Sequence, residues 1–287
     1  MRFNSTLELS DNAGNRLRPH FPTESKLLAA LAFALFGDVP YSQPQANLLD
    51  GLIDAMNAQP LAFVVHVGDI TSGRGPCGDE WLEDRRKQFA RFKHPFVLLP
   101  GDNEWTDCRR TGFDPTERLA MWRELFCFPV KELSLERQKG KYCENVRWVY
   151  DEVVFVGLNI PGGNNNLGDD PVEHGERMQA VFAWLDEAES FAQQRDGLVV
   201  LMHANPFVSR RFGADGYTEV RERLRRLGSA MPGKVLLVHG DTHQYRDDEP
   251  LPGLRRVEVY GSPHIRWAKA RIERTGARLF HVEPVPQ

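Results

Sequence analysis

The 287-residue sequence has no apolar run approaching the roughly 20 residues needed to cross a bilayer, so we expect no membrane partner. It also lacks an excess of one charge, because 36 basic residues stand against 40 acidic ones, for a net charge of −4. This balance excludes a highly charged disordered chain and makes a nucleic-acid partner unlikely on charge grounds. Hydrophobic residues, at 41%, are sufficient for a substantial core.

Near its start the sequence lacks a basic segment followed directly by an apolar one, the pattern of a secretory signal. We therefore expect a cytoplasmic protein from the chain as given, or a periplasmic or secreted one if a signal peptide has been removed. No linker separates the two halves of the chain. We interpret residues 1–25 as an N-terminal extension and residues 26–287 as a single domain.

Cysteine is scarce, and no pair has the close C-x-x-C spacing of a zinc knuckle. The four cysteines are Cys77, Cys108, Cys127 and Cys143. Two interpretations stay open. All four can be reduced, as in a cytosolic protein, or Cys77 and Cys108 can form a disulfide, because both follow motifs assigned below to one site.

Short apolar runs alternate with segments of helical periodicity, and this alternation predicts an α/β fold. We predict two packed sheets with helices on their outer faces, and a loop rich in glycine and asparagine over 161–170. The predicted strands are 28–36, 61–67, 96–99, 146–150, 153–159, 198–202, 235–238, 256–260, 265–272 and 278–282. The predicted helices are 46–58, 80–92, 115–126, 173–193 and 217–227.

Five of the predicted strands end in an aspartate or a histidine. In α/β sheets ligands bind beyond the carboxyl ends of strands, so we expect these side chains at a shared rim. Clustered carboxylates repel one another without a cation, and a mixture of carboxylate and imidazole suits Mn, Fe or Zn better than Ca. The pattern therefore predicts a metal site. Its residues are Asp38, Asp69, Asp102, His203, Asp241 and His243.

The ordered motifs resemble those of the calcineurin-like metallophosphoesterases, which include the purple acid phosphatases. The stretches His-Val-Gly-Asp (66–69) and Pro-Gly-Asp-Asn-Glu-Trp-Thr-Asp-Cys (100–108) look like an uncharacterised bacterial branch of that superfamily. The resemblance covers roughly residues 28–268, and it implies a four-layer αββα sandwich of two mixed sheets with a dinuclear metal centre. It implies one ion held by Asp38, Asp69 and His243. The second ion would be held by Asp69, Asp102, His203 and Asp241.

The implied cofactors are two divalent ions, drawn from Mn, Fe, Zn and Mg. Asp102 and Asp241 replace an asparagine and a histidine of the family pattern, and each adds a negative charge. The extra charge favours harder ions such as Mn or Mg.

The sequence departs from the family pattern at three places near the implied site. Pro40 stands where the first motif usually has a histidine ligand, and Tyr41 could replace that ligand or contact the substrate. Ser72 occupies the place from which purple acid phosphatases supply a tyrosine. Asn103 replaces a histidine that aids phosphate binding or leaving-group protonation, and an amide cannot shuttle a proton.

Two arginines follow the second and third motifs, and arginine binds phosphate bidentately. We predict Arg74, Arg109 and Asn103 as catalytic residues, and Asn103, Tyr41 and Arg109 as substrate-binding residues. Residues 164–166 lie in the loop where the family often places groups that line the site.

The resemblance implies a phosphoesterase that hydrolyses a phosphomonoester or phosphodiester of a small molecule by a metal-activated hydroxide. Without a histidine at position 103, we expect modest activity on aryl phosphates or diesters. An alternative hypothesis, based on Pro40 and Asn103, is a degenerate member that binds metal or a phosphorylated ligand without turnover. A nuclease is a third hypothesis, and the slightly acidic composition does not favour it.

Overall fold

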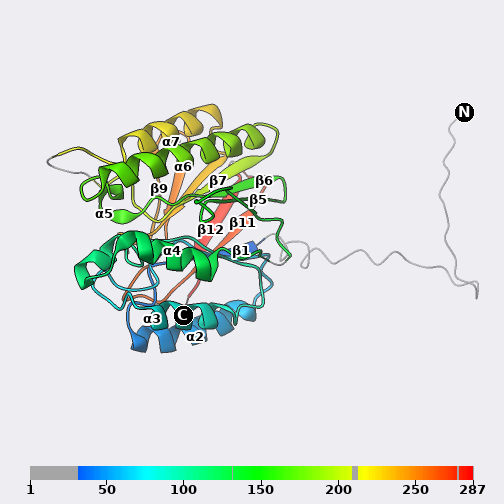
Figure 1. Ribbon diagram of the computed structural model, residues 1–287. Helices are drawn as coiled ribbons and strands as arrows, with labels where there is room; N and C mark the ends of the chain where they lie inside the picture. Colours follow the sequence, from blue (N-terminus) through cyan, green and yellow to red (C-terminus); the bar gives the residue numbers. More distant parts are fainter. Residues whose placement is uncertain (1–31, 131, 209–212, 277, 287) are drawn as a thin grey trace, which may run out of the picture.

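The computed structural model describes residues 32–130, 132–208, 213–276 and 278–286. In these residues two mixed β-sheets lie between layers of helices (Figure 1). The predicted extension, residues 1–25, and the beginning of the first predicted strand lie outside the described residues. Among the described helices, none has the length and apolar character required to span a bilayer.

The first sheet has five strands in the order β12-β11-β1-β2-β3. Strands β1, β2 and β3 run parallel, and β11 pairs antiparallel with β1 and with β12. The carboxyl ends of the three parallel strands therefore meet at one edge. The strands are β1 (Ala32–Phe36), β2 (Val64–His66), β3 (Phe96–Leu98), β11 (Ala268–Ile272) and β12 (Phe280–Pro284).

The second sheet has seven strands in the order β4-β5-β6-β7-β8-β10-β9. Its central strands β6, β7, β8 and β10 run parallel, and the outer pairings are antiparallel. The strands are β4 (Glu136–Arg137), β5 (Val146–Tyr150), β6 (Val153–Gly157), β7 (Gly197–Leu201), β8 (Val235–His239), β9 (Arg246–Leu251) and β10 (Leu254–Glu258).

Helices cover the outer face of each sheet, with α6 and α7 at the top of Figure 1 and α2 and α3 at the bottom. Two short helical segments, η1 and α5, lie in loops. The helices are α2 (Gln43–Asn57), α3 (Asp79–Phe89), η1 (Asp107–Thr111), α4 (Pro115–Phe126), α5 (Gly162–Asn165), α6 (Pro171–Ala192) and α7 (Thr218–Ala230).

The core explains the layering, because alternate residues of a strand point to opposite faces of its sheet. In β1, Phe33 packs between the two sheets against Phe155 of β6, with ring centroids 5.2 Å apart. The adjacent Ala34 and Phe36 pack on the other face, with Ile53 of α2. A third buried cluster joins the second sheet to α6 and α7. The predicted four-layer αββα sandwich is confirmed.

The structure differs from the predicted elements mainly at the sheet edges and in loops. Strand β9 was not predicted, because its sequence Arg-Asp-Asp-Glu-Pro-Leu has no apolar alternation. The two-residue strand β4 and the segment η1 are too short to give a periodic signal. Helix α3 ends at Phe89 rather than at residue 92, and the last strands shift by two to three residues at their ends. A single sequence fixes element boundaries least well.

Candidate metal centre

The carboxyl ends of strands from both sheets bring the predicted metal ligands together at one rim. Ligand atoms of Asp38, Asp69 and His203 lie within 4.8 Å of one another, and so do those of Asp102, His203 and Asp241. The three aspartates that follow β1, β2 and β3 are buried, whereas Asp241, after β8, is half-buried. The predicted clustering is therefore present, and metal binding by these residues stays a prediction.

His203 is oriented with one ring nitrogen toward the carboxylates. Its Nδ1 lies 3.1 Å from the Val67 carbonyl oxygen, which can only accept, so Nδ1 carries a hydrogen. Its Nε2 lies 3.1 Å from Asp102 Oδ1 and 3.3 Å from Asp69 Oδ1. A histidine that donates one nitrogen to a carbonyl and presents the other is the usual arrangement of a metal ligand.

His243 and Tyr41 complete the other half of the cluster. His243 Nδ1 donates to the Ser262 carbonyl at 2.9 Å, which leaves Nε2 facing the cluster, 3.6 Å from Asp38 Oδ1. The Tyr41 hydroxyl lies 2.8 Å from His243 Nε2 and donates to Asp69 Oδ2 at 2.8 Å. Tyr41 therefore places a side-chain oxygen beside these residues, whereas the side chain of Pro40 has no atom that could bind a metal.

Among the described residues, the cluster carries more negative charge than the positive groups around it balance. Burial raises the pKa of Asp38, and it raises the pKa values of Asp69 and Asp241 to about 6 each. Burial also acts on Asp102, but hydrogen bonding and charge from His203 outweigh it and lower the Asp102 pKa. Asp38 Oδ2 is buried and has no hydrogen-bond partner among the described residues. These observations fit divalent cations, which would pair with the orphaned oxygen and neutralise the carboxylates.

Glycines make room for this close approach of carboxylates. A side chain at Gly101 would collide with the Asp69 carboxylate, and one at Gly240 would collide with that of Asp38. Gly162, which we did not predict as a site residue, has the same role. A Cβ atom there would lie 2.6 Å from Asp102 Oδ2 and 2.7 Å from Asp241 Oδ1.

Gly162 is followed by a left-handed turn over 163–166, within the loop predicted to line the site. The four successive φ angles are 57°, 61°, 57° and 60°, a conformation that glycine and asparagine tolerate best. Asn165 holds the turn in place, because buried Arg177 donates to its Oδ1 at 2.7 Å and its Nδ2 donates to the Gly216 carbonyl at 3.0 Å. In the sequence, the run Gly-Gly-Asn-Asn-Asn (162–166) is the feature that could have identified this turn.

Two other contributing residues were missed. Glu104 is fully buried, and its Oε1 accepts from the Gly101 amide at 2.7 Å and the Asp69 amide at 3.2 Å, so it joins the turns after β2 and β3. The Asn205 amide donates to Asp241 Oδ2 at 3.0 Å. Glu104 belongs to the Gly-Asp-Asn-Glu stretch, but no periodic or spacing signal identified Asn205.

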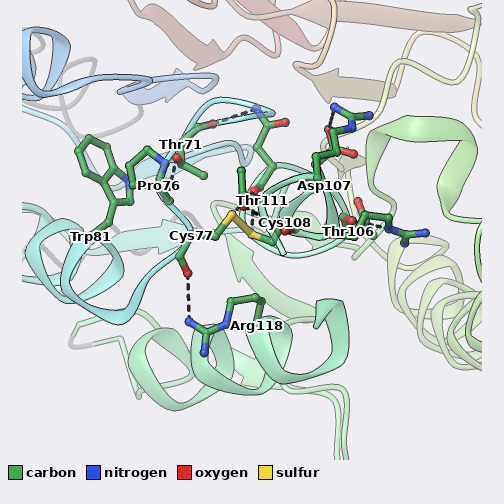
Figure 2. Close-up of a disulfide and its surroundings, with 12 residues drawn as sticks. Thr71, Pro76, Cys77, Trp81, Thr106, Asp107, Cys108, Thr111 and Arg118 are labelled. Atoms are coloured by element: carbon green, nitrogen blue, oxygen red, sulfur yellow. Dashed lines mark hydrogen bonds and ion pairs between the residues drawn. A yellow bond between two sulfur atoms is a disulfide. The ribbon is translucent and has the colours of Figure 1, made fainter. Parts of the chain in front are cut away.

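A disulfide between Cys77 and Cys108 joins the loop after β2 to η1 (Figure 2). Its sulfur atoms lie 3.6 and 3.3 Å from the Asn103 carbonyl oxygen, and the Arg118 guanidinium donates to the Cys77 carbonyl at 3.0 Å. The predicted alternative in which Cys77 and Cys108 form a disulfide is therefore the one that the structure has. The interpretation with four reduced thiols is wrong, because a further disulfide, which we did not predict, joins Cys127 to Cys143.

The three residues predicted as catalytic have different surroundings. The Asn103 side-chain amide donates to the Thr71 carbonyl at 2.8 Å. Arg109 donates to Asn166 Oδ1 at 2.6 Å and forms an ion pair with Asp169 at 3.1 Å. Arg74 is exposed and forms no hydrogen bond or ion pair with the residues that the structure describes. Their roles toward a substrate stay predictions.

Comparison with known proteins shows the fold. No family model matches the chain, and no curated protein matches it in sequence. A dimetal phosphatase from Danio rerio is 14% identical with a TM-score of 0.57, and the match covers 86% of this chain and 94% of that one. A putative 5′-nucleotidase from Staphylococcus aureus is 13% identical with a TM-score of 0.51, covering 88% of this chain and 52% of the nucleotidase.

GAP50 of Plasmodium, described as the anchor in the inner membrane complex, is 12% identical with a TM-score of 0.52. That match covers 89% of this chain and 84% of GAP50. The chain therefore has the calcineurin-like metallophosphoesterase fold, and its structural neighbours include hydrolases as well as a protein described as an anchor.

Proposed function

We propose that the chain is a divalent-metal-dependent phosphoesterase that hydrolyses a phosphomonoester or phosphodiester of a small molecule. The observation that carries the proposal is the group of four aspartates around His203, three of them buried, whose charge the residues described by the structure do not balance. The dimetal phosphatase and the nucleotidase that share the fold support this reaction class.

The predicted ligand sets divide the cluster into two halves that share Asp69. One ion would be held by Asp38, Asp69 and His243, with the Tyr41 hydroxyl beside them. The other would be held by Asp69, Asp102, His203 and Asp241. Two bound divalent ions would lower the pKa of an attacking water and neutralise charge on the phosphoryl oxygens.

The chain's own residues orient these ligands. The carbonyls of Val67 and Ser262 hold the two imidazoles by Nδ1, so that each Nε2 faces the carboxylates. Burial and the neighbouring carboxylates raise the pKa of Tyr41, so its hydroxyl stays protonated at neutral pH and donates a hydrogen bond to Asp69 Oδ2. Because Asn103 cannot transfer a proton, substrates with good leaving groups should react fastest.

The test is a metal count on freshly purified protein by elemental analysis, paired with assays on p-nitrophenyl phosphate and bis-p-nitrophenyl phosphate with added Mn. We expect close to two metals per chain and Mn-stimulated turnover. One metal or none, with no turnover after reconstitution, would contradict the proposal.

That second outcome would favour a degenerate member that binds metal or a phosphorylated ligand without turnover. A specific observation supports this second candidate. The Asn103 side chain occupies the place of a family histidine, and its amide is already bonded to the Thr71 carbonyl. Retention of phosphate by the metal-loaded protein, without hydrolysis of either ester, would identify it.

We also infer that the chain works in an oxidising compartment, which favours the periplasmic or secreted alternative over the cytoplasmic one. The support is the pair of disulfides, which involve all four cysteines and are rare in cytosolic proteins. Mass spectrometry after thiol alkylation, with and without reductant, should find no alkylated cysteine before reduction. Alkylation of all four without reductant would contradict the inference.

A further inference from the structure

An apolar cavity of about 380 Å³ lies at the opposite end of β3 from the metal centre. Asp102 follows β3, whereas the cavity is bounded by the residues that precede and begin the strand, and by the C-terminal ends of α3 and α4. The Phe96 ring stacks on Phe92 with centroids 4.6 Å apart and lies 4.9 Å from that of Phe89. The apolar wall consists of Phe89, Phe92, Phe96, Leu98, Leu125 and Phe126.

Three cations line the same cavity: Arg86, Lys93 and Arg137. Arg137 donates to three backbone carbonyls at 2.8 to 3.1 Å, and burial lowers its pKa to about 10. The guanidinium carbon of Arg86 lies 4.9 Å from the centroid of the Phe128 ring. Within the described part of the chain none of these cations pairs with a carboxylate, and the acidic lining residue, Glu132, is exposed.

The segment around Phe128 forms the lip of the cavity, and a disulfide and hydrogen bonds hold it in place. The Cys127–Cys143 disulfide ties the segment after α4 to the residues before β5. Arg137 reinforces this link, because it donates to the carbonyls of Phe126, Phe128 and Cys143. Phe128 nevertheless remains 45% exposed, which leaves an aromatic ring uncovered at the lip. The cavity is thus pre-formed but not filled by the described residues.

We propose that this cavity binds a fatty acid, with the acyl chain against the phenylalanine wall and the carboxylate at the three cations. Each of the six wall side chains lacks a polar atom, so the buried part of the ligand must be hydrocarbon. Three cations that form no ion pair with the described residues, two of them exposed, favour an anionic head group over a neutral or cationic one. The volume lies within the range of small-molecule sites. The site is separate from the metal centre and does not depend on the phosphoesterase proposal.

The test is isothermal titration of the full-length protein with laurate, kept below its micelle concentration. We expect saturable binding of one laurate per chain. Lys93→Glu should weaken it about tenfold or more, because it removes one cation and adds a like charge beside the carboxylate. The matched control is Lys87→Glu, which makes the same charge change on exposed α3 surface outside the cavity and should change the affinity less than twofold.

A second variant tests the wall without changing charge. Ala90 is exposed and lines the cavity, so Ala90→Trp should fill it and abolish laurate binding while leaving the thermal midpoint unchanged. Absence of saturable binding by the native chain would overturn the proposal. So would equal weakening by Lys87→Glu and Lys93→Glu, or dodecanol binding as tightly as laurate. A concentration-dependent dimer that Ala90→Trp disrupts, without laurate binding, would assign the face to a second copy and also overturn it.

Discussion

The two ends of the parallel strands β1 to β3 have opposite charge imbalances. At the carboxyl ends, Asp38, Asp69 and Asp102 are buried around His203, and their negative charge exceeds the positive charge that the described part of the chain places there. At the amino end of β3, an apolar cavity is lined by three cations that form no ion pair with the described residues. A disulfide braces each end. This difference underlies the two proposals, in which a cation would complete the first end and an anion the second.

The largest expected effect comes from the carboxylate shared by both predicted metal sites. Asp69→Asn should lower turnover more than about a hundredfold, since losing even an outer partner of a metal ligand costs 10- to 100-fold. Laurate affinity should not change. The readouts are kcat with Mn on bis-p-nitrophenyl phosphate and a metal count.

Asp84→Asn is the matched control, because it removes the same charge from exposed helix surface and should leave turnover unchanged. If purified Asp69→Asn keeps full metal-dependent turnover, the carboxyl ends of the strands are not the site of hydrolysis.

Metal removal should produce the next largest effect, and it should depend on pH. In the metal-free chain the folded-state pKa values of Asp69 and Asp241 are raised from 3.8 to about 6. Between these values the folded state binds more protons than the unfolded state, so these groups reduce stability as pH rises from about 4 to 6. If these aspartates bind Mn as proposed, bound Mn would remove that penalty at neutral pH, and protons would compete with it below about pH 6.

We therefore expect Mn at about 100 times its Kd to add about 2.7 kcal/mol to the free energy of unfolding at pH 7.5, and much less at pH 5. Urea titrations with Mn and with EDTA at both pH values measure this difference. A Mn effect of equal size at pH 5 would mean that these two aspartates do not bind the metal.

Removing each disulfide in turn tests whether the two ends are braced independently. Each paired Cys→Ser change should cost about 2 to 4 kcal/mol of stability. The Cys77–Cys108 loss should cost about 0.6 kcal/mol more in a loop-entropy account, because it spans 31 residues rather than 16. Turnover should fall about tenfold only without Cys77–Cys108, because that disulfide lies against the Asn103 carbonyl.

Without Cys127–Cys143, laurate affinity should fall and turnover should stay within twofold of the native value. The measurements are urea unfolding, kcat and laurate titration on both double variants, at a temperature where circular dichroism shows that both are folded. Equal loss of turnover in both would show that the disulfides act only through global stability.

The contrast between the ends also explains which features the sequence could predict. The strands that end in Gly-Asp give a local signal, an apolar run followed by a turn residue and an acid, so the aspartates of the rim were predictable. The Cys127–Cys143 disulfide and the cavity were not, because they depend on how the segment after α4 folds against β5 and α3. Asn205 was missed for the same reason, since its contact with Asp241 joins different loops.

Tyr41→Phe should have a moderate effect that is confined to the metal-centre end. It removes the hydroxyl that lies 2.8 Å from both Asp69 Oδ2 and His243 Nε2 but keeps the ring. We expect about tenfold weaker binding of one of two metals, measured by competition with a chromogenic chelator, and thermal stability without metal should change little. Tyr245→Phe is the control, since it makes the same chemical change on a ring that stacks on Tyr260. Equal affinity of the native chain and Tyr41→Phe for both metals would exclude Tyr41 from the centre.

The smallest expected effects are those of replacing Arg74 and Arg109, the two arginines that we predicted from the sequence to act on the substrate, and the two replacements should differ. The guanidinium of Arg109 is already bonded to Asn166 and paired with Asp169, whereas Arg74 is exposed and, within the described residues, unpaired. Because a free guanidinium can take up phosphate without breaking existing bonds, Arg74→Ala should raise KM several-fold with kcat unchanged. Contrary to the role predicted for Arg109 from the sequence, Arg109→Ala should leave KM within twofold and cost about 0.5 kcal/mol of stability, as for a partly exposed ion pair. Michaelis–Menten analysis of both variants decides the matter, because a larger KM increase for Arg109→Ala would mean that its bond to the left-handed turn gives way when substrate binds.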